Sequence, residues 1–336
     1  MTQASLLLAA AVVALAVAGV HARRRAALKL PRVSRRWRRE LRVAATVARE
    51  CGLAILDATA RKEAGLAAGG VDWKDAGGID PCTQTDRDNE ARVERALRTA
   101  FPAHAIIGEE AAAAAGAIPR LGDGPTWIVD PIDGTQNFVH GLPLSVVSVG
   151  LCVARAPTLG VVYNPHNDEL FVGVAGEGAW RNGARIACDA RARALSQALV
   201  LIDPGYERSA LGVRRLAAKY LRLLRANTRA VRCLGSSVYS LVLVACGRAS
   251  GFVIGLGDGD SPKPWDWCAA AVIAREAGAT LRMLDQRRSP PGDEARPAGE
   301  GETFDLYSRS CVCAGAPELA DELQRLALEA MAQPVN

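Results

Sequence analysis

Residues 127–138 read Trp-Ile-Val-Asp-Pro-Ile-Asp-Gly-Thr-Gln-Asn-Phe. An apolar run enters a turn with two carboxylates, a proline and a glycine, which predicts a buried strand ending in a tight loop. The proline restricts one φ angle and the glycine permits a left-handed one, so the loop can curl. Asp130, Asp133 and the carbonyl of Ile132 can then face one hard cation of the Mg²⁺ type. An ordinary Asx turn uses the same residue types and is the alternative.

Three further stretches carry carboxylates next to predicted elements. Residues 106–110 read Ile-Ile-Gly-Glu-Glu, again an apolar run that ends in glycine and acids. Residues 83–86 read Thr-Gln-Thr-Asp before a helix, and residues 264–271 place Asp266 at the start of a helix of small residues. Each of Asp86 and Asp266 has an alternative reading as a helix cap, because aspartate is common there. Together with the loop that carries Asp130 and Asp133, these acidic segments can build one site for several cations.

The four motifs, in this order, closely resemble the signatures of the inositol monophosphatase family, T-x-x-D, G-E-E, D-P-(I/L)-D-G-T-x-N-F and W-D-x-A-A. The resemblance covers residues 41–328, and four ordered motifs are far more specific than any one of them. It implies an α+β and α/β protein, a layered αβαβα sandwich that follows an N-terminal hydrophobic segment. We expect an α+β part over residues 40–190 with most metal ligands, and an α/β part over residues 191–330 with Asp266 and the substrate side.

A phosphate monoester resists hydrolysis because its anionic oxygens repel nucleophiles, and clustered Mg²⁺ overcomes this by neutralising them and activating water. The family resemblance implies this chemistry without a covalent phosphoenzyme. The metal ligands that it implies are Glu109, Asp130, the Ile132 carbonyl, Asp133 and Asp266. The catalytic residues that it implies are Glu109 and Thr135, which orient and deprotonate the attacking water, and Asp86, which helps to order the catalytic water network. The substrate-binding residues that it implies are Asp133, Gly134, Thr135, Ser236, Ser237 and Asp266.

The glycine-rich residues 64–81 predict a mobile loop or ribbon. In the family this region carries a lysine close to the metal centre. The sequence leaves both Lys62 and Lys74 as candidates for that lysine. The closing helix of the chain is expected over residues 318–331.

The substrate that the resemblance favours is inositol 1-phosphate, a small phosphorylated metabolite. The family places a ring-binding glutamate before its W-D motif, but this chain reads Ile254-Gly255 there, followed by an enlarged loop. Asp258 and Asp260 in that loop are candidate replacements. The alternatives are a 3′(2′),5′-bisphosphate nucleotidase, another small sugar-phosphate phosphatase or, from a different class, an inactive membrane-tethered binding protein.

The charge and the cysteine content indicate which classes of partner the chain can bind and the redox state of its compartment. Of the net charge of +5, residues 1–39 carry +9 with no acid, so the remaining chain carries −4. An acidic body argues against nucleic acid as a partner, because such surfaces cluster lysine and arginine. The nine cysteines include no C-x-x-C pair, which predicts reduced, buried thiols in a reducing compartment.

Residues 5–20 form an uncharged apolar run followed directly by arginines. As a helix the run would reach about 24 Å, a little less than the roughly 30 Å hydrocarbon core of a bilayer. The positive-inside rule then predicts a membrane anchor with a cytosolic catalytic body. A cleaved signal peptide and a plastid or mitochondrial transit peptide are the alternatives. The resemblance adds lithium sensitivity and a homodimer.

Overall fold

The computed structural model describes residues 27–66, 70–75, 77–255, 262–284 and 305–332. The first elements are η1 (Arg35–Trp37), α2 (Arg38–Glu63), β1 (Val71–Trp73), β2 (Pro81–Thr83), α3 (Gln84–Ala100), β3 (Ala105–Gly108), α4 (Glu109–Ala115), β4 (Thr126–Asp133), α5 (Thr135–His140), β5 (Val146–Val153), β6 (Ala156–Asn164), β7 (Glu169–Val174), β8 (Gly178–Arg181) and β9 (Ala184–Arg185). The later ones are η2 (Leu195–Gln197), β10 (Leu199–Asp203), α6 (Ala210–Arg225), β11 (Ala230–Cys233), α7 (Ser237–Ala245), β12 (Gly251–Ile254), α8 (Pro264–Glu276), β13 (Thr280–Arg282), β14 (Cys311–Ala314) and α9 (Pro317–Ala332).

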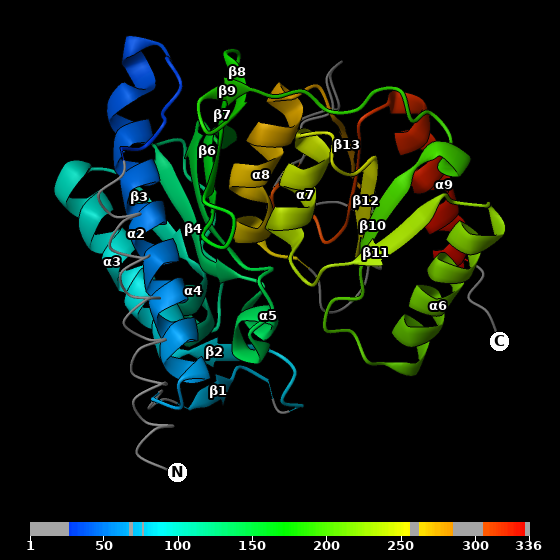
Figure 1. The fold of residues 1–336 in the computed structure, drawn as a ribbon, viewed down its shortest axis with the longest axis horizontal. Helices are drawn as coiled ribbons and strands as arrows, with labels where there is room; N and C mark the ends of the chain where they lie inside the picture. The colour runs from blue at the N-terminus through cyan, green and yellow to red at the C-terminus, as the bar shows by residue number, and fades with distance from the viewer. Residues whose placement is uncertain (1–26, 67–69, 76, 256–261, 285–304, 333–336) are drawn as a thin grey trace.

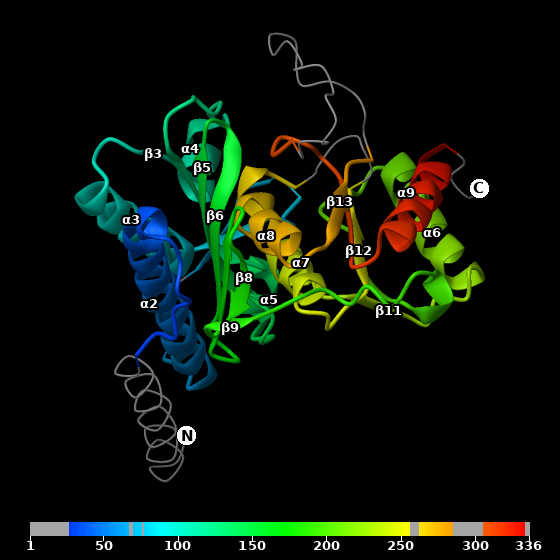
Figure 2. The ribbon, with the colours of Figure 1, turned by 90° about the horizontal axis from the view of Figure 1, so that it is seen from above.

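These elements stack in five layers (Figure 1). Helices α2 and α3 cover one face of a seven-stranded sheet, and α7 and α8 lie between that sheet and a five-stranded one. Helices α6 and α9 close the far side, as the view from above in Figure 2 also shows. The predicted αβαβα sandwich is therefore confirmed for the described residues.

The seven-stranded sheet has the order β3-β4-β5-β6-β7-β8-β9. Strands β3 and β4 are parallel, and the later neighbours pair antiparallel. Strands β5 to β7 are buried on both faces, which explains their nearly continuous apolar sequences. Helix layers on both sides exclude water from this sheet.

The five-stranded sheet has the order β11-β10-β12-β14-β13. Strand β10 lies parallel to β11 and to β12, with α6 and α7 as the crossover connections. Strand β14 runs antiparallel to its neighbours β12 and β13. The carboxyl ends of β10, β11 and β12 lie at one edge, where α/β sheets usually bind ligands.

A row of three glycines sets the distance between α8 and the seven-stranded sheet. Gly150, Gly160 and Gly173 are direct register partners on β5, β6 and β7. A Cβ atom at Gly160 would lie 2.1 Å from the carbonyl oxygen of Ala269, and one at Gly173 would lie 2.7 Å from Cα of Ile273. The backbone of α8 can approach this closely only because the three strands carry no side chain there.

Two further expectations concern the start of the chain and the loop over residues 64–81. The apolar run at residues 5–20 lies outside the described residues. Within the described part of the chain, no helix combines the length and apolar character needed to cross a membrane. In the loop, β1 and β2 pair antiparallel, so the described residues there form a ribbon.

The cysteines are all free thiols. Eight are buried or half-buried, as predicted, but Cys233 is exposed at the end of β11. The prediction of buried thiols is therefore wrong for Cys233, because β11 is the edge strand of its sheet.

Candidate active site

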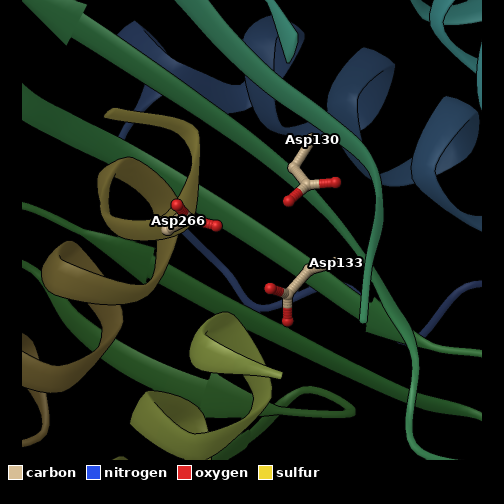
Figure 3. A group of neighbouring side chains, drawn as sticks. All are labelled: Asp130, Asp133 and Asp266. Atoms are coloured by element: carbon tan, nitrogen blue, oxygen red, sulfur yellow. The ribbon is translucent and has the colours of Figure 1, made fainter. Parts of the chain in front are cut away.

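Three carboxylates converge where β4 ends and α8 begins. Asp130 and Asp133 come from β4 and Asp266 from the first turn of α8, and one ligand atom of each lies within 4.8 Å of the others. Figure 3 shows the three side chains pointing toward one another. Residues three apart on a regular strand face opposite sides, but the pairing of β4 with β5 is irregular between Asp130 and Asp133. That irregularity lets both side chains reach the same site.

Local hydrogen bonds hold each carboxylate in place. Asp130 Oδ1 accepts from the backbone N–H of Ile132 at 2.9 Å. Asp133 Oδ2 accepts from the Ser236 hydroxyl and from the N–H of Val238 at 3.1 Å, at the start of α7. Asp266 Oδ2 accepts from the N–H of Lys263 at 2.6 Å, so Lys263 is the N-cap of α8 and Asp266, its third residue, completes a capping box while it joins the cluster.

The cluster is electrostatically costly without a cation. Burial raises the pKa of Asp130, of Asp133 and of Asp266, and the charge of Glu109 raises all three pKa values further. Like charges this close disfavour simultaneous ionisation. The three carboxylates supply the hard oxygen ligands that Mg²⁺ prefers, and its charge would remove their repulsion. The donor set therefore fits a magnesium ion.

Gly134 takes the left-handed conformation that the sequence predicts, with a φ of 86°. A Cβ atom there would lie 2.9 Å from the carbonyl oxygen of Leu144, so only glycine fits without strain. The turn delivers Thr135 to the first position of α5.

Asp86 and Thr135 are hydrogen-bonded to each other. Thr135 Oγ1 lies 2.8 Å from the carbonyl oxygen of Ile132 and 3.2 Å from Asp86 Oδ1, so its one proton can be donated to either. Asp86 Oδ2 accepts from the N–H of Thr83 at 2.8 Å, which makes Thr83 the N-cap of α3 and Asp86 its third residue. The alternative reading of Asp86 as the N-cap itself is therefore wrong. Burial raises the pKa of Asp86 to about 7.

Lys74, not Lys62, lies at the site. Lys74 Nζ donates to Glu109 Oε1 at 2.6 Å and to Glu110 Oε1 at 2.8 Å. Lys62 Nζ instead donates to the carbonyl oxygen of Val139. The Glu109 carboxylate is not in the group of three that meet within 4.8 Å, because the ammonium of Lys74 holds it. Its role as a metal ligand stays a prediction.

Glu90 is a site residue that the sequence analysis missed. Its two carboxylate oxygens accept from the N–H groups of Glu110 and Ala111, both at 2.8 Å, and so anchor the first turn of α4. A Cβ atom at Gly108 would meet the Glu90 carboxylate at 2.5 Å, so the glycine before the two glutamates leaves room for it. The available signal was its spacing, because Glu90 lies four residues after Asp86 on the same face of α3.

The predicted substrate residues line one cleft of about 850 Å³. Its walls include the three clustered aspartates, Glu109, Gly134, Thr135, Ser236 and Ser237. Residues that the sequence analysis did not single out also line it, among them Asp203, Tyr206 and Cys233. The cleft therefore runs from the cation cluster to the carboxyl ends of β10 and β11.

The raised pKa values predict an unusual pH dependence of the metal-free protein. A carboxyl whose folded pKa lies above its unfolded value binds more protons in the folded state, so stability falls as pH rises between the two values. We expect the Tm of the metal-free protein to fall by roughly 5 °C or more between pH 5 and pH 8. Adding Mg²⁺ should raise Tm at pH 8 far more than at pH 5. Thermal unfolding with EDTA and with Mg²⁺ measures both effects.

The variant Asp130→Asn supplies the control for that measurement. It removes one ionisable member of the cluster, so its metal-free Tm should fall less between pH 5 and pH 8. If the Tm of the wild type and the Tm of the variant fall equally between pH 5 and pH 8, other groups cause the pH dependence. The electrostatic account of the cluster would then be wrong.

Comparison with known proteins agrees with this geometry. The sequence model of the inositol monophosphatase family matches residues 37–332. The chain is 43% identical to Inositol monophosphatase 1 of Solanum lycopersicum over 206 residues, which are 61% of this chain and 72% of that protein. It is 40% identical to Inositol monophosphatase 2 of the same species over 240 residues, 71% of this chain and 83% of that protein.

Comparison with solved structures supports the same family fold. The solved structure of an IMPase from Thermotoga maritima superposes with a TM-score of 0.69 at 27% identity, over 87% of this chain and 98% of that one. The family model covers most of the chain, and the layered fold agrees with that structure. The chain belongs to the inositol monophosphatase family.

Proposed function

We propose that the chain is a Mg²⁺-dependent phosphate monoester hydrolase that converts inositol 1-phosphate to myo-inositol and inorganic phosphate. The observation that carries the proposal is the convergence of Asp130, Asp133 and Asp266 from two separate elements. The relatives named inositol monophosphatase support the choice of substrate.

The site divides the chemistry between the cation and the protein. Mg²⁺ bound at the carboxylates would supply positive charge to the phosphate oxygens and increase the acidity of water. Thr135 and Asp86, which are hydrogen-bonded to each other, would orient the attacking water, and the pKa of Asp86 near 7 suits it to accept a proton at neutral pH. Gly134 and Thr135 begin α5 on the cleft wall, where N–H groups of a first helical turn can bind an anion.

A phosphate-release panel tests the proposal. With purified full-length chain, we expect release from inositol 1-phosphate with Mg²⁺, almost none with EDTA, and inhibition by lithium. Parallel assays use 3′-phosphoadenosine 5′-phosphate and sugar monophosphates. Faster hydrolysis of the nucleotide would replace the proposal with a bisphosphate nucleotidase. No hydrolysis of any ester, together with no Mg²⁺ binding in a titration, would support the inactive binding protein instead.

Membrane attachment through residues 5–20, the cytosolic or organellar location of the body, and a homodimer stay predictions. They rest on the apolar run, the basic residues after it and the family resemblance.

A further inference from the structure

Asp203 places a carboxylate beside Ile254 on the cleft wall. Strands β10 and β12 are parallel, and Asp203 at the end of β10 is the direct register partner of Ile254 at the end of β12. Both residues line the cleft. Ile254 offers no polar atom beyond its backbone, so the carboxylate on this part of the wall comes from β10.

Asp203 is held in place from its own loop. Its Oδ1 accepts from the N–H of Gly205 at 3.0 Å, in a turn whose glycine has a φ of 60°. One carboxylate oxygen is therefore engaged by the backbone. The carboxylate can accept further hydrogen bonds, because an ionised carboxylate offers about four lone-pair sites.

A buried lysine lies behind this part of the wall. The side chain of Lys219, on α6, is 2% exposed, and its Nζ has no hydrogen-bond partner among the described residues. The charge of Asp203, at the end of β10, acts favourably on the charged form of this amine. Helix α6, which carries Lys219, is the connection between β10 and β11.

The charges define which ligand fits. Lys219 favours the ionised form of Asp203, while burial raises the pKa of Asp203. The charge of Asp203 in turn raises the pKa of Asp133 in the cation cluster. An anionic group, such as a second phosphate, would be repelled at this end of the cleft, whereas a hydroxyl can donate to the carboxylate.

We propose that Asp203 is a specificity-determining residue that accepts a hydrogen bond from a hydroxyl of the leaving alcohol. The ligand class is a polyol monophosphate, either a cyclitol or a sugar. This inference rests on the proposed function, since it assigns the alcohol end of the same cleft. Asp258 and Asp260, the replacements that the sequence suggests, lie outside the described residues.

The test compares two esters that differ in hydroxyls. kcat and KM are measured with Mg²⁺ for inositol 1-phosphate and for 4-nitrophenyl phosphate, whose leaving group has none. For Asp203→Asn, kcat/KM should fall 10- to 100-fold on the inositol ester, the range expected for a lost hydrogen bond to a charged group, and stay within about threefold on the nitrophenyl ester.

Glu207→Gln is the matched control. Glu207 belongs to the same loop, but its Oε1 accepts from the N–H of Ser209 and it is not among the cleft residues, so both esters should be unaffected. If kcat/KM of Asp203→Asn falls equally for the two esters, or falls for neither, the assignment of Asp203 is overturned.

The two proposals fail separately. If the wild type hydrolyses another polyol monophosphate but not inositol 1-phosphate, the proposed function is wrong. The role of Asp203 is then decided by comparing kcat/KM for that ester with kcat/KM for 4-nitrophenyl phosphate. Retained selectivity of Asp203→Asn for that ester would overturn the inference, and lost selectivity would support it.

Discussion

Replacing Asp130 with asparagine should lower Mg²⁺-dependent phosphate release by roughly a thousandfold or more, because a neutral amide is a far weaker ligand for a hard cation. The amide oxygen can still accept from the N–H of Ile132, so the turn should keep its shape. Burial and neighbouring charges already disfavour ionised Asp130. The metal-free variant should therefore be as stable as the wild type, or more stable.

Two measurements distinguish this result from simple misfolding. Phosphate release should be lost while the metal-free Tm is kept, and the increase of Tm on adding Mg²⁺ should shrink. Asp123→Asn is the control, because the side chain of Asp123 is 86% exposed and forms a surface ion pair with Arg155. Its activity should match the wild type. Full activity in Asp130→Asn would refute the mechanism.

The variant Gly160→Ala should destabilise the protein by about 3 kcal/mol or more, through overpacking between β6 and α8. The new methyl group would lie 2.1 Å from the carbonyl oxygen of Ala269 and 2.8 Å from its Cα. These are backbone atoms, so a change of rotamer cannot relieve the contact. Either α8 lifts from the sheet or the protein fails to fold.

Lifting α8 would also move Asp266 away from Asp130 and Asp133, so any folded Gly160→Ala protein should bind Mg²⁺ weakly. Chemical denaturation and Mg²⁺-dependent Tm shifts measure the two consequences. Gly122→Ala is the control, since no atom lies within 4 Å of its added methyl group. A second change, Ala269→Gly, should not rescue the variant, because the clash is with backbone. A Tm within about 2 °C of the wild type would contradict this account of the glycine row.

Several parts of the site could be read from the sequence because they depend on local chemistry. The strand before Asp130, the left-handed Gly134 and the capped helix after Thr83 all follow from residues within one turn of one another. The family motifs then indicated which acidic segments lie together in the fold. The convergence of Asp130, Asp133 and Asp266 agrees with that expectation.

Other parts depended on which segments meet in space. Lys62 and Lys74 are equivalent by composition, and the contact of Lys74 with Glu109 and Glu110 distinguishes them. Glu90 was missed because its partners, the N–H groups of the first turn of α4, lie about twenty residues further along the chain. Its spacing from Asp86 indicated a shared face but not what that face would contact.

The sequence by itself determined the elements, the acidic turns and the family, because helix periodicity, turn residues and motif order are properties of neighbouring residues. The tertiary structure alone decided that three glycines align under α8 and that Asp203 lies beside Ile254. Both depend on strand register. A shift of one residue in a strand turns every side chain to the other face, and the packing of the whole sheet selects the register.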